Sequence, residues 1–298
     1  MILLLGSVFL SAYLTIAFKL CDRFGINKFQ AIVFNYMACA VTGSLVTGSW
    51  PAYAQSMSAP WFKWALLMGA SFIVIFNLIA FTVQKSGLAV ATVASKLSLV
   101  IPFGVSLFLY QEQLLWMKLA GVLLALVAVV FTLYPSEKAS LDGVAPVSAF
   151  SGWQKVLLPL VVFVSSGMLD SLIKYVEQHF ITPNNNDQYL ITAFSVAFFL
   201  GFAFFLVRLA AGKMVFQPKT VLVGFLIGIP NYFSIWCLMG VLKQYGNISS
   251  VIIPVNNMGI VLFSALVAWI FFKEKLSQVN WFGIALAIIS IMMIAFGQ

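Results

Sequence analysis

Long apolar runs constrain this chain more than any other feature. A helix needs about 20 predominantly apolar residues to cross the hydrocarbon layer of a bilayer, and the sequence contains ten such windows. They cover approximately residues 2–21, 29–49, 61–84, 88–110, 114–134, 154–178, 188–210, 220–242, 247–272 and 278–297. Lipid offers backbone groups no hydrogen-bond partner, and the runs lack the alternation of barrel strands. All ten windows are therefore predicted to be helices of an all-α membrane protein.

Composition agrees with this prediction. Hydrophobic residues make up 62% of the chain and charged residues 8%, whereas a soluble domain carries about 25% charged residues. The net charge of +8 is spread singly over short loops, where basic residues set topology and contact lipid headgroups. We expect a multi-pass protein of the inner (cytoplasmic) cell membrane, a monomer or homodimer. Its expected partners are the bilayer and a small-molecule substrate, and not nucleic acid.

The two halves of the chain repeat each other. At an offset of 162 residues, Glu112 matches Glu274 and Gly121 matches Gly283. At an offset of 159, Gly69 matches Gly228 and Gly87 matches Gly246. At an offset of 155, Ser11, Leu14 and Lys19 match Ser166, Leu169 and Lys174. Each half holds five predicted spans, an odd number, so the second half is expected to be inverted relative to the first. We predict a first repeat over 1–134, a polar linker over 135–153 and a second repeat over 154–298.

This pattern resembles the drug/metabolite transporter superfamily, in particular its ten-helix EamA-like branch. The resemblance rests on the glutamates that end the fourth and ninth spans, the glycines that open the fifth and tenth, and Lys19 and Lys174. It implies a central cavity enclosed by spans 1–4 and 6–9, with spans 5 and 10 at the periphery. It also implies transport of a small metabolite by alternating access. The substrate stays open, because the family carries amino acids, sugars, nucleotide sugars, phosphorylated sugars and drugs.

Two charged residues lie well inside predicted spans, where each costs about 3 kcal/mol on insertion scales. Asp170 can pair with Lys174 one turn along its helix or with Lys96 on another span. Alternatively, it faces the cavity, where it binds an amine or carries protons. Lys96 can extend to the membrane surface, or it can bind a carboxylate or phosphate of the substrate. Asp170 is also the candidate proton-coupling residue.

A second set of polar and aromatic residues occupies the same spans. Its members are Asn35, Tyr36, Asn77, Asn231, Tyr232, Trp236, Asn256 and Asn257. Pro230 and Pro254 come just before two of these groups, and transporters place their sites at interrupted helices. Any single Asn can simply join two helices, at about 0.6 kcal/mol. The whole set, together with Lys96 and Asp170, is predicted to line a wet, substrate-binding cavity.

The sequence therefore favours a secondary active transporter of a small polar or zwitterionic metabolite, resembling an amino acid. Other solutes (sugars, nucleotide sugars, drugs), exchange or export, and a channel remain alternatives. An enzyme is not expected, because the single histidine, His179, has no partners for a metal or triad site. No cofactor is expected, and no phosphate-binding loop is present. Glu112 and Glu274 are interpreted as structural residues.

Two features of the sequence predict opposite orientations of the chain in the membrane. The count of Lys and Arg in alternate loops favours both termini outside, whereas the family resemblance implies both inside.

Overall fold

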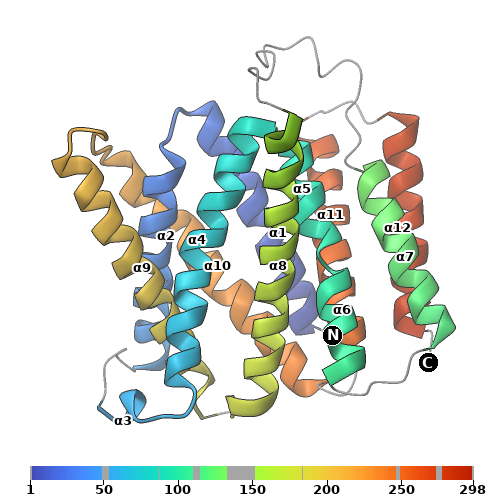
Figure 1. The fold of residues 1–298 in the computed structure, drawn as a ribbon, viewed down its shortest axis with the longest axis horizontal. Helices are drawn as coiled ribbons and strands as arrows, with labels where there is room; N and C mark the ends of the chain where they lie inside the picture. Colours follow the sequence, from blue (N-terminus) through green and yellow to red (C-terminus); the bar gives the residue numbers. More distant parts are fainter. Residues whose placement is uncertain are drawn as a thin grey trace. The chain divides into compact units, whose positions relative to one another are not determined.

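The computed structural model describes residues 2–48, 54–86, 88–109, 115–132, 152–182, 184–245, 249–272 and 277–296. Regular structure within these ranges is entirely α-helical (Figure 1). The helices are α1 (Ile2–Arg23), α2 (Lys28–Thr47), α3 (Ala54–Met57), α4 (Phe62–Ser86), α5 (Leu88–Leu97), α6 (Val100–Leu109), α7 (Trp116–Thr132), α8 (Gly152–Phe180), α9 (Asn186–Ala210), α10 (Lys219–Gln244), α11 (Ser249–Phe272) and α12 (Gln278–Phe296). Glu112, Glu274, Gly87, Gly246 and residues 135–151 of the predicted linker lie outside the described residues.

Six segments of the described chain are long and apolar enough to cross a membrane. They are Lys28–Thr47, Phe62–Thr82, Ala91–Leu109, Leu157–Phe180, Asn186–Ala210 and Lys219–Gln244. Shorter apolar helices occupy Ile2–Phe18, Trp116–Thr132, Val251–Val267 and Gln278–Ile294. These segments match the predicted windows to within two residues where they extend beyond them, and the helices have the length and composition of a multi-pass membrane protein.

The fourth window, 88–110, differs from its prediction as one continuous span. The chain leaves the helix after Leu97 and resumes it at Val100. Pro102 lacks the N–H that would bond the carbonyl of Ser98. That carbonyl instead accepts from the N–H of Ile101 at 2.9 Å, the tighter pattern of a 3₁₀ turn. The span is therefore interrupted next to Lys96, the charged residue that it carries.

The helices form two compact units. The first contains residues 1–77 and 172–244, and the second contains residues 78–171 and 245–298. The division falls within α4 and within α8, so each unit combines helices from both predicted repeats. The repeats describe sequence similarity, whereas the units describe contacts in space.

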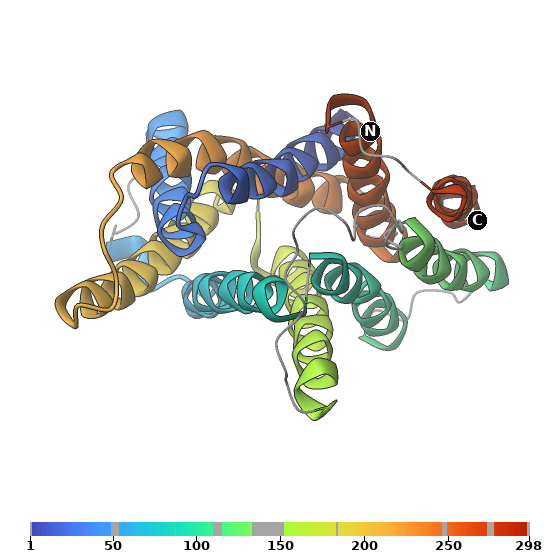
Figure 2. The ribbon, with the colours of Figure 1, turned by 90° about the horizontal axis from the view of Figure 1, so that it is seen from above.

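In the first unit, α10 packs along α1 and α2, and α9 packs on α2 (Figure 2). A Cβ atom on Gly228 would collide with the backbone carbonyl of Asn35, and one on Gly69 would collide with the carbonyl of Ala193. Glycine lets two helix backbones approach closely at both places. Gly69 and Gly228 are a matched pair of the sequence repeat, and each makes its close contact with a helix of the other predicted repeat.

In the second unit, α7 and α12 lie side by side (Figure 1). A Cβ on Gly121 would lie 3.1 Å from the backbone nitrogen of Ile294, and one on Gly283 would collide with the backbone nitrogen of Thr132. The hydroxyl of Ser290 also donates to the carbonyl of Gly121 at 2.9 Å. In the sequence repeat, Gly283 is equivalent to Gly121 and Ile294 is equivalent to Thr132, both at an offset of 162 residues. The two contacts are therefore reciprocal.

A polar contact holds the start of α2 in the first unit. Asn27 caps the helix by accepting from the N–H of Gln30 at 3.1 Å. The amide of Gln30 donates to the carbonyl of Val215 at 2.7 Å and accepts from the N–H of Gln217 at 2.9 Å. These bonds tie the segment before α10 to the start of α2 and so set the register in which the two helices meet.

Candidate functional site

Three side chains on three helices of the second unit form a hydrogen-bonded array. The ammonium of Lys96, at the end of α5, donates to Oδ1 of Asn257 on α11 at 3.2 Å. The Nδ2 of the same amide donates to Oδ2 of Asp170 on α8 at 3.2 Å. Lys96 and Asp170 are half-buried, and Asn257 is buried. The amide therefore stands between a cation and an anion inside helices of membrane-spanning composition.

A helix break and a proline lie close to this array in the chain. Lys96 lies two residues before the interruption at Ser98–Leu99, and Pro254 lies inside α11 one turn before Asn257. Asn256 is 5% exposed, and its Oδ1 accepts no hydrogen bond from the described residues. A buried, unsatisfied acceptor is costly unless a ligand or water donates to it. An unsatisfied acceptor therefore lies on the residue next to Asn257 in the chain.

The structure brings Lys96 and Asp170 together through an amide. Of the pairings considered for Asp170, the electrostatic interaction with Lys96 is present, and the amide of Asn257 is hydrogen-bonded to both groups. Lys174 belongs to the first unit, is 1% exposed and interacts electrostatically with Glu177. The bridging role of Asn257 depends on which side chains meet across helices, so the sequence carried no signal for it.

Asn35 and Asn231 are paired with each other in the first unit. Nδ2 of Asn231 donates to Oδ1 of Asn35 at 3.1 Å, and both side chains are buried. The thiol of Cys39 donates to the carbonyl of Gly228 at 3.2 Å beside them. These contacts join α2 to α10, as expected for polar residues that hold membrane helices together.

Tyr36 and Tyr232 are also buried in the first unit. Each is 1% exposed, and neither hydroxyl has a hydrogen-bond partner among the described residues. The ring of Tyr36 stacks on Phe72 and Phe194, with centroids 6.1 and 6.2 Å away. Phe194 also contacts Tyr232, with centroids 6.2 Å apart. The two predicted site tyrosines thus belong to one aromatic cluster.

The remaining predicted residues make local contacts in the first unit. Nδ2 of Asn77 donates to the carbonyl of Ile73 in its own helix at 2.6 Å. Trp236 is 37% exposed, and its indole N–H donates to Oδ1 of Asp187 at 2.9 Å. The ten predicted site residues therefore divide. Lys96, Asp170, Asn256 and Asn257 lie in the second unit, and Asn35, Tyr36, Asn77, Asn231, Tyr232 and Trp236 lie in the first.

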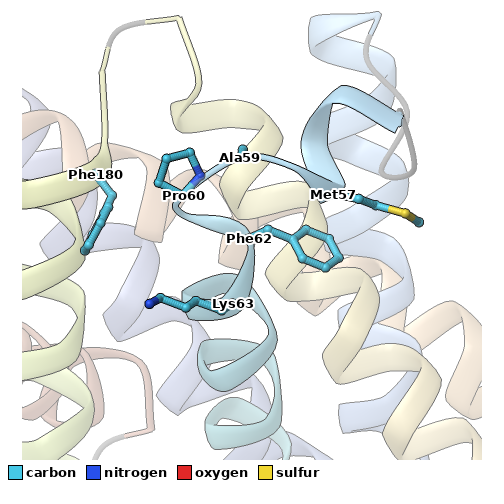
Figure 3. Close-up of a pocket in the computed structure, with 6 residues that line it drawn as sticks. All are labelled: Met57, Ala59, Pro60, Phe62, Lys63 and Phe180. Atoms are coloured by element: carbon cyan, nitrogen blue, oxygen red, sulfur yellow. The ribbon is translucent and has the colours of Figure 1, made fainter.

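A separate pocket lies at the beginning of α4 in the first unit, with a volume of about 350 Å³. It is lined by Met57, Ala59, Pro60, Phe62, Lys63 and Phe180 (Figure 3). Lys63 is the one charged member of this lining, and its ammonium lies 5.5 Å from the ring centroid of Trp64. None of the ten predicted site residues lines the pocket, so its chemistry is unrelated to the charged array.

Comparison with known proteins identifies relatives without a stated activity. No family model matches the chain. An uncharacterized protein of Haemophilus influenzae is 24% identical over 296 residues, covering 97% of this chain and 95% of that protein. A crystal structure, described only as that of a protein, matches with a TM-score of 0.72. It covers 98% of this chain and 94% of its own, with 14% sequence identity. The chain therefore has a fold that occurs among solved structures.

Proposed function

We propose that the protein is a secondary active transporter that moves a small polar or zwitterionic metabolite across the inner membrane by alternating access. The observation that carries the proposal is the Lys96–Asn257–Asp170 array in the second unit. Charged side chains are costly in membrane helices and mark substrate or ion pathways when they occur. One cation, one anion and a neutral amide form a binding surface for a solute that carries both charges.

Two further features support a transporter. The fourth predicted span, which carries Lys96, is interrupted at Ser98–Leu99, and the ninth, which carries Asn257, contains Pro254 within a continuous helix. Interrupted helices supply the sites of many secondary transporters. Asp170 is the proposed proton-coupling residue, because a carboxylate beside a substrate site can exchange a proton as its partners change.

The proposed architecture is ten spans in two inverted five-helix repeats, as in the drug/metabolite transporters that the sequence resembles. Its support comes from the reciprocal glycine contacts, Gly121 with Ile294 and Gly283 with Thr132. A twofold axis that relates the halves must pair each contact with its symmetry mate. A structure in a bilayer in which residues 61–134 and 220–297 superpose poorly, or run in the same direction, would overturn this architecture.

Counterflow tests the proposed activity. Purified protein is reconstituted into liposomes loaded with single solutes from a metabolite collection, and entry of the same labelled solute is measured. A carrier shows uptake stimulated by internal solute, whereas a channel does not. Lys96→Gln should weaken uptake of carboxylate-bearing solutes about tenfold or more, because it removes a charge-assisted contact. Absence of stimulated uptake for every solute would reject the proposal.

A further inference from the structure

The amide of Asn257 presents its two ends to opposite charges. A lysine ammonium has only donors and an ionised carboxylate has only acceptors. The amide can therefore lie between Lys96 and Asp170 in one orientation, with its oxygen toward the cation and its nitrogen toward the anion. Both contacts are 3.2 Å long. The side chain thus offers one acceptor and one donor on adjacent atoms of a small planar group.

An α-amino acid presents the same two functions at nearly the same separation. Standard bond lengths place the oxygen and nitrogen of an amide about 2.3 Å apart, and the nearest carboxylate oxygen and the ammonium nitrogen of an α-zwitterion about 2.7 Å apart. Each methylene inserted between the two groups of a β- or γ-amino acid lets them move further apart. The match is therefore closest for charges that are carried on one carbon atom.

From this match we infer that Asn257 is an internal substitute for the substrate, and that the substrate is an α-zwitterion. This inference rests on the proposed function and assigns its substrate class. When the solute binds, its carboxylate takes the place of the Asn257 oxygen on Lys96, and its ammonium takes the place of the Asn257 nitrogen on Asp170. When the site is empty, the amide keeps both charges hydrogen-bonded.

The exchange is energetically reasonable in both directions. A lone half-buried charge in a membrane is costly, so an empty carrier benefits from a neutral group that satisfies both of its charges. The amide meets Lys96 and Asp170 with partial charges only, whereas a zwitterion meets each with a full opposite charge, so Coulomb attraction favours the zwitterion at both partners. The buried Oδ1 of Asn256, which has no donor among the described residues, is a further acceptor on the adjoining position.

The inference makes Asn257 a determinant of specificity. A simple amine can bind Asp170 but offers no partner to Lys96. A simple carboxylate can bind Lys96 but offers no partner to Asp170. ω-Amino acids carry both charges but separate them by more than the amide does. Discrimination should therefore follow the distance between the charges and depend less on the side chain of the solute.

The test measures dissociation constants of purified full-length protein for 2-, 3- and 4-aminobutyrate, which have the same atoms and charges at increasing separation. Wild type should bind the 2-isomer at least about tenfold more tightly than the 4-isomer. Asn257→Ala removes the internal competitor and should tighten binding of the 2-isomer about fivefold relative to the 4-isomer. Ser290→Ala is the matched control, since it removes a buried hydrogen bond of the same unit without contacting the array.

Equal binding of the three isomers to wild type would overturn the inference, as would an Asn257→Ala variant that weakens all of them alike. If the Asn257→Ala variant does not fold, Asn257→Ser is used in its place. The serine side chain is too short to reach both charges. If wild type transports another solute but binds none of the three isomers, this inference is rejected and the proposed function stands. Wild type that transports nothing in the counterflow screen would reject both.

Discussion

Buried asparagines are used differently in the two units. In the first unit Asn231 bonds Asn35, so two neutral amides join α2 to α10. In the second unit Asn257 lies between a cation and an anion. A neutral pair between membrane helices contributes about 0.6 kcal/mol on average, whereas a hydrogen bond to a charged group is worth roughly 1.5–3 kcal/mol. The same residue type therefore supports packing in one unit and, as we propose, substrate exchange in the other.

Replacing Asp170 with Asn should have the largest effect on transport. The variant keeps a carbonyl that accepts from the substrate but has no carboxylate that can take up a proton. We expect loss of proton-driven accumulation, with solute exchange retained at substrate concentrations well above the wild-type KM. Uptake in liposomes with and without a pH gradient measures both activities. An unchanged pH dependence of uptake would show that Asp170 is a static structural partner.

Disrupting the close glycine contacts should have the next largest effect, which is a loss of folding stability. Gly283→Ala places a methyl group against the backbone of Thr132, which cannot move aside as a flexible side chain can. Overpacking of this kind costs about 1–3 kcal/mol. Gly104→Ala in α6 is the control, because no atom lies within 4 Å of its Cβ position. Thermal unfolding in detergent should show a lower Tm for the first variant alone, and equal Tm values would contradict the contact.

Asn231→Ala sharpens the comparison between the two asparagine sites. It breaks the bond to Asn35 and should destabilise the protein by about 0.6–1.7 kcal/mol. Uptake per folded molecule should change little, in contrast to Asn257 variants. Thr192→Ala, which removes a bond within α9 to the carbonyl of Gln188, should cost less. If Asn231→Ala removes substrate binding without affecting stability, the predicted binding role of Asn231 holds and the packing role does not.

The smallest effect on stability is expected for the partly exposed Trp236 in the first unit. Trp236→Phe keeps the ring packing and removes the N–H that bonds Asp187. Because Trp236 is 37% exposed, water can replace part of this bond, and the loss should be about 0.5 kcal/mol or less. Denaturant unfolding of this variant beside Trp116→Phe, an 80% exposed tryptophan, measures the difference. A loss above that of Asn231→Ala would contradict this ranking.

The helix positions follow closely from hydropathy. The eighth window, 220–242, corresponds to α10 (Lys219–Gln244), and the second, 29–49, corresponds to α2 (Lys28–Thr47). Lipid and a buried backbone together leave few alternatives to a helix, so composition alone places these elements. The interruption of the fourth window had a local signal in Pro102 that marks the break at Ser98. The short helix α3 (Ala54–Met57) had none, because it is too short to show a period.

The sequence by itself determined which residues are chemically unusual. Lys96, Asp170 and Asn257 stand out in apolar helices because polar groups there are costly to bury. The tertiary structure alone decided their partners: Asp170 bonds Asn257, and Asn231 bonds Asn35. Hydropathy and spacing act along one helix, whereas partners depend on how separate helices cross. Those crossings depend on close backbone contacts such as Gly228 against Asn35 and Gly283 against Thr132, which join residues far apart in the chain.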